Sequence, residues 1–276
     1  MKRVMIHHNY KPETLKAKKV LIRLLKQNHF HLVDQRPELI IVIGGDGTML
    51  SAVRSHRQKH VPFIGVNTGS LGFLPTVGPN QLEELVDVLN QKKYTIQKYP
   101  LLKVKCTTVT GTIVENYAFN EILLKHVEPR LMEAKLYINQ KPFNYFTGDG
   151  LIISTPIGAT GYAIWAGGVS THSELPVFQI TPLNPNDNSI NRPLKHSMVV
   201  PLDTHLNLQV VKARSRAVIV ACDGIKVSND YIQELDVNVA EDSIKILRIG
   251  DFDYFEFYKH KIIDKNISRS LESETR

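Results

Sequence analysis

The sequence predicts an α/β N-terminal region built on a parallel sheet, followed by a mostly antiparallel β region. Three observations support this prediction. Short apolar runs alternate with amphipathic helical patterns over the first hundred residues. One apolar run, 39–43, is β-branched in four of its five positions and leads directly into a glycine-rich loop. Beyond Tyr99 and Pro100 the pattern changes to short alternating segments separated by turns.

The N-terminal elements follow one another as strand, loop and helix, and this order repeats. A strand buried on both faces of a parallel sheet has a continuous apolar run, and a surface helix has apolar residues at a period of about 3.6. The repetition indicates a parallel sheet with helices on both sides. The predicted strands are 4–6, 39–43 and 62–66, and the predicted helices are 13–27, 49–58 and 81–90.

The C-terminal elements are mainly strands. One helix is expected at 161–169, the aromatic segment 252–263 is strand-like or a short helix, and the polar tail after Ile263 is expected to be frayed. The strand-like segments are 101–109, 112–124, 133–141, 150–155, 205–211 and 216–224.

Length and composition indicate a soluble, intracellular globular protein. At about 150 residues per domain, 276 residues make one large domain or two ordinary ones. No apolar run approaches the roughly 20 residues that span a bilayer, and the first residues lack the apolar stretch of a signal peptide. Cys106 and Cys222 form no CxxC pair, which suits a reducing compartment. We therefore expect a cytoplasmic protein without a membrane partner.

The formal net charge of +7 raises the question of a nucleic-acid partner. Lysine and arginine are scattered along the chain, and their densest patch, Lys16 to Lys19, fits the solvated face of a helix. No zinc-finger spacing and no RNA-recognition aromatic signature accompanies it. A smaller anion such as a nucleotide phosphate fits the same charge, so no nucleic acid is expected.

The strongest local motif is the loop at 44–48, Gly-Gly-Asp-Gly-Thr, which follows the apolar run 39–43. Ligands of open α/β sheets bind at the carboxyl ends of the strands, where glycines let backbone N–H groups approach a phosphate. A tight turn alone would explain the glycines. It would not explain Asp46, whose carboxylate is typical of a group that accepts a proton from a hydroxyl or holds a metal ion.

Three further segments have both a structural and a functional interpretation. Asn120 and Glu121 interrupt an apolar run, either as a solvated strand end or as a pair that reads ribose hydroxyls or an adenine edge. The Gly-, Ser- and Thr-rich segment 148–162 has the composition of a loop shaped around a ligand. The segment 222–224 is either a plain hairpin turn or part of the same site.

Several common motifs are missing from the sequence. It contains no GxGxxG dinucleotide fingerprint, no phosphate-binding P-loop and no HExxH zinc motif. The eleven histidines do not cluster at ligand spacing, so no protein-ligated metal site is predicted.

Together these motifs resemble the NAD kinase family, in the family's order and over most of the chain. The matching segments are IGGDGT at 43–48, NTGSLGFL at 67–74, YPLL at 99–102, NE at 120–121, GDGLIISTPIGATGY at 148–162 and DG at 223–224. The ordered set is specific, whereas GGDGT alone also occurs in lipid kinases.

The resemblance implies a fold and an assembly. It implies an α/β nucleotide-binding domain at 1–100, completed by about 251–265, and a β-sandwich-like NAD-binding domain at 101–250, with a frayed tail at 266–276. Family members are homo-oligomers, usually dimers or tetramers, with the site near the subunit interface.

The resemblance also implies the activity, the phosphorylation of the 2′-hydroxyl of the adenosine ribose of NAD by ATP or polyphosphate. Mg²⁺ would bridge the phosphates of ATP, held partly by water and substrate and not by a cage of protein ligands. Asp46 matches the catalytic aspartate, which would accept the hydroxyl proton. The positions that match the nucleotide-binding residues of the family are Asp46, Gly47, Asn120, Glu121, Asp149, Thr160, Gly161, Tyr162, Trp165 and Asp223.

The sequence departs from the family pattern within the third long motif. Ile157, Ala159 and Gly161 stand where the family usually has Thr, Ser and Ala, and Trp165 stands where a Ser is usual. These changes bear on substrate affinity and on the choice between NAD and NADH. Two other functions are open: a lipid kinase that shares GGDGT, and a dinucleotide-binding regulator without catalytic activity.

Overall fold

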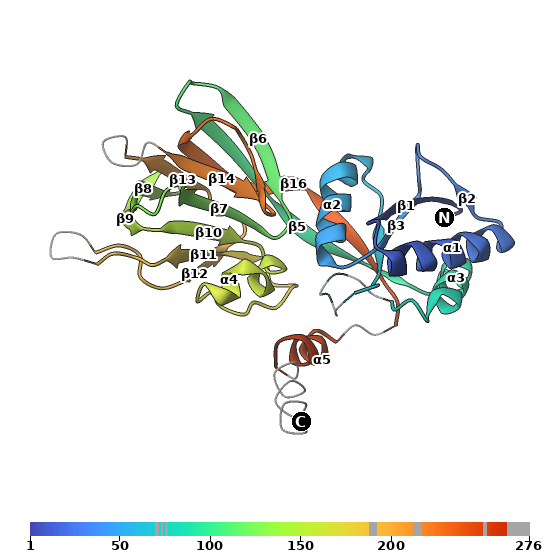
Figure 1. Cartoon of the computed structure of the whole chain (residues 1–276). Coiled ribbons are helices and arrows are strands. Elements are labelled where there is room, and N and C mark those ends of the chain that lie inside the picture. Colours follow the sequence, from blue (N-terminus) through green and yellow to red (C-terminus); the bar gives the residue numbers. More distant parts are fainter. Residues whose placement is uncertain are drawn as a thin grey trace, which may run out of the picture. The chain divides into compact units, whose positions relative to one another are not determined.

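The computed structural model describes residues 1–69, 72, 74, 77–187, 192–211, 217–250 and 253–263. The chain forms two compact units, one of Met1–Lys98 with Ile244–Arg276 and one of Tyr99–Ser243 (Figure 1). The first unit has a parallel sheet and the second is mostly β, so the predicted fold class is confirmed. The expected frayed tail, and Ser70, Leu71 and Phe73 of the 67–74 motif, lie outside the described residues.

The first unit is built on a parallel sheet in the order β2-β1-β3-β4-β16. All five residues of β3 are buried, as a strand covered on both faces requires. β16 contributes only its last residues, with Ile246 opposite Phe63 of β4. The strands are β1 (Arg3–His8), β2 (His31–Leu32), β3 (Leu39–Ile43), β4 (Phe63–Val66) and β16 (Ile232–Arg248).

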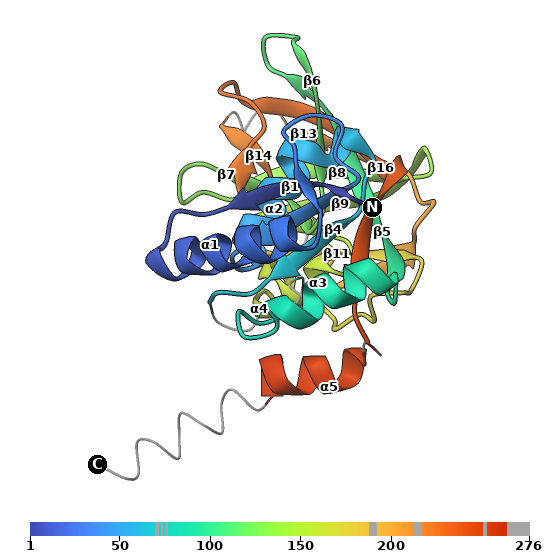
Figure 2. The ribbon, with the colours of Figure 1, turned by 90° about the vertical axis from the view of Figure 1, so that its right-hand side faces the viewer.

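Helices cover both faces of this sheet. The buried side chains of α1 and α3 share one apolar core with Leu39 and Ile41 of β3. Figure 2 shows the ribbons of α1 and α3 next to each other. α2 contacts β1 and β3, and its buried Met49 and Val53 are outside that core. The helices are α1 (Pro12–Gln27), α2 (Asp46–His56), the 3-10 turn η1 (Arg57–Lys59), α3 (Leu82–Gln91), α5 (Tyr254–Tyr258) and the π-helical turn η3 (Lys259–Ile263).

The second unit has antiparallel strands in two sheets around one apolar core. In one sheet, β13 pairs with β8 and β16, β8 with β9, and β5 with β6 and β16; the other sheet has the order β12-β11-β10-β7-β14-β15. The sheet that contains β13 has the strands β5 (Thr95–Thr108), β6 (Ile113–Ala118), β8 (Met132–Ile138), β9 (Lys141–Gly148) and β13 (Leu206–Val210). The other sheet has the strands β7 (Glu121–His126), β10 (Gly150–Ser154), β11 (Val177–Leu183), β12 (Met198–Pro201), β14 (Val218–Cys222) and β15 (Ile225–Lys226).

One predicted helix is shorter than its pattern, and one ambiguous segment resolves to a helix. The helix expected at 161–169 is only α4 (Tyr162–Trp165), preceded by the 3-10 turn η2 (Gly158–Thr160). Gly167 takes a φ of +83° and the N–H of Gly168 bonds back to the carbonyl of Ala163, which ends the helix. The aromatic segment was expected as a strand or a short helix, and its described part forms the short helix α5, whose first N–H groups are capped by the Asp253 carboxylate.

No helix within the described ranges is long and apolar enough to cross a membrane.

Candidate functional site

The glycine-rich loop joins β3 to α2 in the first unit. Gly44 has a φ of +152°, and a Cβ there would lie 2.2 Å from Thr48 Oγ1, so the turn requires glycine. A Cβ at Gly47 would meet nothing within 4 Å. Packing therefore requires a glycine at Gly44 but not at Gly47. A glycine at Gly47 leaves the backbone uncovered, as expected where a ligand must approach it.

Asp46 is the first residue of α2 and is half-buried. Its Oδ1 accepts a hydrogen bond of 3.1 Å from the N–H of Leu74, which joins the loop to the 67–74 motif. Thr48 Oγ1 accepts one of 3.1 Å from Asn9 Nδ2, so the end of β1 also supports the loop. The open N-terminal turn of α2 at the carboxyl end of a parallel strand suits a phosphate, with Asp46 beside it.

In the second unit, the turn between β14 and β15 binds the segment before β7. Asp223 occupies this turn with a φ of +47°. Its carboxylate accepts hydrogen bonds from the N–H groups of Phe119 (2.9 Å), Asn120 (2.7 Å) and Glu121 (3.2 Å). Its own N–H donates to the carbonyl of Glu121 at 3.0 Å. Asp223 therefore fixes the backbone of residues 119–121.

The segment after β10 holds the same backbone from its other side. Thr155 Oγ1 donates to the carbonyl of Phe119 at 2.6 Å, and its N–H donates to the carbonyl of Asn120 at 2.9 Å. A Cβ at Gly158 would lie 2.0 Å from the Asn120 carbonyl oxygen, so only glycine allows this approach. Sequence reasoning did not single out Thr155 and Gly158 as positioning residues, although both lie in the quoted 148–162 motif.

Two polar atoms remain unsatisfied at this junction. Asn120 Oδ1 and Glu121 Oε2 are buried and have no hydrogen-bond partner among the described residues. A Cβ at Gly161 would lie 3.2 Å from Glu121 Oε2 and 3.7 Å from Asn120 Nδ2, so Gly161 adjoins both side chains. Buried acceptors without partners are rare, and a ligand with hydroxyl or amine donors would satisfy them.

The environment of Glu121 changes its acidity. Burial, and then the neighbouring Asp223 carboxylate, raise the pKa of Glu121 to about 7. Cys222 ends the adjacent strand, and burial raises the pKa of its thiol as well, so it is neutral. Glu121 is thus poised between its acid and its carboxylate near neutral pH.

Asp149 lies between two glycines that the sheet requires. A Cβ at Gly148 would lie 2.8 Å from the Leu183 carbonyl oxygen, and one at Gly150 would lie 2.3 Å from the Leu124 carbonyl oxygen. Asp149 itself is exposed, and its Oδ2 accepts a hydrogen bond of 2.8 Å from Asn184 Nδ2. The close packing of four strands, β7, β9, β10 and β11, therefore accompanies an exposed carboxylate at Asp149.

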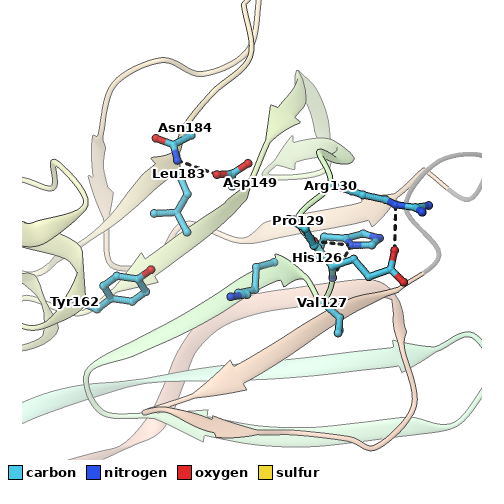
Figure 3. A pocket seen from close by; sticks show the side chains of 10 residues that line it. His126, Val127, Pro129, Arg130, Asp149, Tyr162, Leu183 and Asn184 are labelled. Atoms are coloured by element: carbon cyan, nitrogen blue, oxygen red, sulfur yellow. Dashed lines mark hydrogen bonds and ion pairs between the residues drawn. The ribbon is translucent and has the colours of Figure 1, made fainter.

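A pocket of about 470 Å³ opens beside Asp149. Figure 3 shows Tyr162 on one side of it and His126 and Arg130 on the other, with Asp149 and Asn184 between them. Its lining residues are Lys125, His126, Val127, Glu128, Pro129, Arg130, Asp149, Tyr162, Leu183 and Asn184.

The remaining predicted residues lie on η2 and α4. Thr160 Oγ1 donates to the carbonyl of Ile157 at 3.0 Å, so its hydroxyl caps the local turn. The Trp165 side chain is 80% exposed. Within the second unit, the structure brings Asn120, Glu121, Gly161 and Asp223 together and puts Asp149 and Tyr162 on one pocket; Asp46 and Gly47 belong to the first unit.

Comparison with known proteins matches both units to domains of one family. The ATP-NAD kinase N-terminal domain model matches residues 8–94, and the ATP-NAD kinase C-terminal domain model matches 119–249. The chain is 32% identical over 256 residues to NAD kinase of Lacticaseibacillus paracasei, covering 92% of this chain and 96% of that one. It is 34% identical over 202 residues to NAD kinase of Streptococcus gordonii, covering 72% and 73%.

Solved structures share the fold at lower identity. Yeast NADH kinase complexed with NADH superposes with a TM-score of 0.82 at 19% identity, covering 95% of this chain and 87% of that chain. NAD kinase from Archaeoglobus fulgidus in complex with ATP gives a TM-score of 0.71 at 23% identity, covering 94% and 96%. The family matches and the relatives together confirm the expected resemblance and do not favour a lipid kinase or a regulator: this chain belongs to the NAD kinase family.

Proposed function

We propose that this chain transfers a phosphoryl group from ATP or polyphosphate to the 2′-hydroxyl of the adenosine ribose of NAD, which yields NADP. The family match makes this activity the expected one. The observation in this chain that supports it is that two buried acceptors, Asn120 Oδ1 and Glu121 Oε2, have no hydrogen-bond partner among the described residues. A ribose or an adenine amine supplies the donors that they need.

Asp46 is the proposed catalytic residue. Phosphoryl transfer depends mostly on the in-line position of donor and acceptor and on neutralisation of phosphate charge. The N-terminal turn of α2 would hold the donor phosphates, and the Asp46 carboxylate would orient the attacking hydroxyl and accept its proton. A carboxylate is a weak base for an alcohol, so proton transfer comes late and orientation is the larger contribution.

Three accompanying properties are part of the proposal. Mg²⁺ would arrive with the donor phosphates and keep most of its waters, as it usually does, with the Asp46 carboxylate a suitable oxygen donor nearby. The protein would act as a homo-oligomer, a dimer or a tetramer, which size-exclusion chromatography with light scattering measures. Its location would be the cytoplasm, where free thiols such as the buried Cys106 and Cys222 persist.

The first prediction concerns Asp46. Purified protein with NAD, Mg²⁺ and ATP should form NADP, measured with an NADP-specific dehydrogenase. Asp46→Asn should lower turnover by roughly a hundredfold or more, because it removes the base and the negative charge that orients the hydroxyl. Binding of NAD, followed by calorimetry, should stay within about twofold of the wild type.

Asp87→Asn is the matched control, since Asp87 is an exposed carboxylate on α3 and its loss should leave turnover unchanged. Parallel reactions with polyphosphate and with NADH identify the preferred donor and acceptor. Near-normal turnover of Asp46→Asn would contradict the role of Asp46. Absence of NADP from the wild type, with NAD still bound, would favour the regulator without catalytic activity.

A further inference from the structure

The end of β1 contacts α2 near both ends of that helix. Asn9, directly after β1, donates from Nδ2 to Thr48 Oγ1 at 3.1 Å, in the first turn of α2. His7 Nδ1 and His56 Nε2 are 3.2 Å apart, and His56 is the last residue of α2. Thr48 and His56 are eight positions apart, which is about 12 Å of helix. One short segment therefore holds α2 at two well-separated points.

His7 and Asn9 lie on the face of β1 that α2 covers. Side chains alternate between the two faces of a strand. Val4 belongs to the apolar core shared by α1 and α3, and Ile6 packs against it. His7 therefore points to the opposite face, where α2 contacts β1, and Asn9 continues the alternation.

The side chain of Asn9 is fixed by its neighbours. Its Oδ1 accepts a hydrogen bond of 3.1 Å from the N–H of Lys11, which leaves Nδ2 to donate to Thr48. A Cβ at Gly44 would lie 2.9 Å from Asn9 Nδ2, so this amide packs directly against the glycine-rich loop. Asn9 thus contacts both the first glycine and the threonine of the loop that contains Asp46.

His8 joins the same segment to α1. The ammonium group of Lys18 has only donors, so His8 Nε2 accepts their hydrogen bond of 2.8 Å. The ring proton of His8 is therefore on Nδ1, which donates to the carbonyl of Asn9 at 2.7 Å. The backbone of Asn9 is held from α1 while its side chain holds the loop.

The contact between His7 and His56 depends on the charge of the two rings. Two neutral imidazoles form one hydrogen bond, in which one nitrogen donates and the other accepts, whereas two imidazolium rings have only donors. The titratable groups that act on the pair are His8 on β1, Arg54 on α2 and Lys59 in η1. Burial, and then the neighbouring rings and cations, lower the pKa of both His7 and His56. Both rings are therefore neutral at neutral pH, and their hydrogen bond is intact.

We propose that His7 and Asn9 are positioning residues for phosphoryl transfer, a clamp that holds α2 and Asp46 in place and that acid opens at His56. This inference rests on the proposed function. Asp46 is the first residue of α2, so movement of the helix shifts its carboxylate relative to the donor phosphates. As the pH falls below the ordinary histidine value of 6.5, protons on both rings remove their hydrogen bond and place two cations beside Arg54.

The first test measures the turnover of Asn9→Ala. The substitution should lower kcat by roughly fivefold to tenfold, as the loss of one hydrogen bond does, and should leave KM for NAD within about twofold. Asn80→Ala is the matched control, since Asn80 is an exposed asparagine of the first unit outside these contacts. An unchanged kcat in Asn9→Ala would overturn the role of Asn9.

The second test removes the titration and keeps the contact. The amide of an asparagine replaces Nδ1 of His7, and that of a glutamine replaces Nε2 of His56, so His7→Asn/His56→Gln can form a hydrogen bond that protonation does not break. Between pH 7.5 and 5.5, kcat of the wild type should fall at least about threefold more than that of the double variant, because the neutral fraction of a histidine decreases up to tenfold per pH unit. His31→Gln, at an exposed histidine on β2, should keep the wild-type pH profile.

Hydrogen exchange of the α2 amides provides a measurement that does not need activity. At pH 5.5 these amides should exchange faster in the wild type than in the double variant, and at pH 7.5 the two proteins should agree. If the double variant does not fold, the single variant His56→Gln takes its place, since it leaves His7 a partner.

The outcomes separate the clamp from the proposed function. Equal exchange at pH 5.5, or pH profiles of kcat that run parallel, would overturn the acid opening of the clamp. A wild type that forms no NADP contradicts the proposed function, and the exchange comparison then still decides whether the clamp opens.

Discussion

Glu121 shows how three local features act on one carboxyl group. It is pinned at its backbone by Asp223, its Oε2 is buried, and no described residue donates a hydrogen bond to that atom. Both burial and the negative charge of Asp223 disfavour the ionised form and raise the pKa of Glu121 to about 7. Ionised Glu121 therefore destabilises the unliganded fold.

This destabilisation predicts a pH dependence of stability. Below the ordinary pKa of 4.5, Glu121 is protonated in the folded and the unfolded states, and its burial is least costly. Between 4.5 and about 7 the unfolded chain releases the proton first, so the free energy of unfolding falls as pH rises. Above a pH of about 7 this loss of folding stability is complete.

Glu121→Gln removes the titration, and urea unfolding of both proteins at several pH values measures the effect. The wild type should lose stability relative to Glu121→Gln as pH rises through this window, by on the order of 3 kcal/mol. A stability difference that stays constant from pH 4.5 to 7 would show that Glu121 titrates normally.

At the scale of the element, η2 and its following turn form the wall against which residues 119–121 pack. The ideal Cβ of Gly158 would meet backbone, the carbonyl oxygen of Asn120, at 2.0 Å. The ideal Cβ of Gly161 would be 3.2 Å from the side-chain Glu121 Oε2 and also 3.2 Å from the Gly158 carbonyl oxygen. The wall therefore tolerates a methyl group far less well at Gly158 than at Gly161.

Gly158→Ala should consequently destabilise the second unit by roughly 2–4 kcal/mol, because backbone must move to admit the methyl group. Gly161→Ala should lower the free energy of unfolding by less than half of that amount. Thermal unfolding measures both variants, and similar losses for the two would mean that η2 yields easily and does not fix Asn120.

Much of the element structure follows from the sequence pattern. The apolar run 39–43 and the helical periods at 13–27 and 81–90 correspond to β3, α1 and α3, because burial of one or two faces leaves a direct signature in the sequence. The helix at 161–169 was overestimated, since apolar spacing continues past Gly167, whose positive φ ends the helix. Periodicity does not record where the backbone turns.

The candidate site was less predictable. Its motifs are visible in the sequence, but the contacts between them are not. Asp223 is about a hundred residues from Asn120 in sequence, and the three hydrogen bonds from residues 119–121 to its carboxylate arise only when β14 pairs with β7.

At the scale of the whole molecule, two strands belong to both units. β5 begins in the first unit and continues into the second, and β16 returns from the second unit to the first. Leu247 near the end of β16 is fully buried in the core shared by α1, α3 and β3. The first unit thus depends on residues that follow its other strands by nearly two hundred positions.

Leu247→Ala should therefore destabilise the first unit by about 2–5 kcal/mol, as cavities in well-packed cores do. Hydrogen exchange of the amides of β3 and β4 should become faster. Leu32→Ala is the control, because Leu32 on β2 is 38% exposed and its truncation leaves no internal cavity. Unchanged exchange in β3 and β4 for Leu247→Ala would mean that β16 adds little to the first sheet.

The return of β16 also sets an order of events during protein synthesis. β4 leaves the ribosome long before residue 246, its partner in the sheet, has been made. At 5–20 residues per second, the intervening chain takes on the order of 10–40 s to translate. Val77 is made soon after β4 and pairs with Val66, but the Phe63 end of the same β4 edge waits for Ile246. Over that time this part of the edge is open to chaperones or to a neighbouring nascent chain. Slow codons in this interval would lengthen the exposure without changing any residue of the finished enzyme.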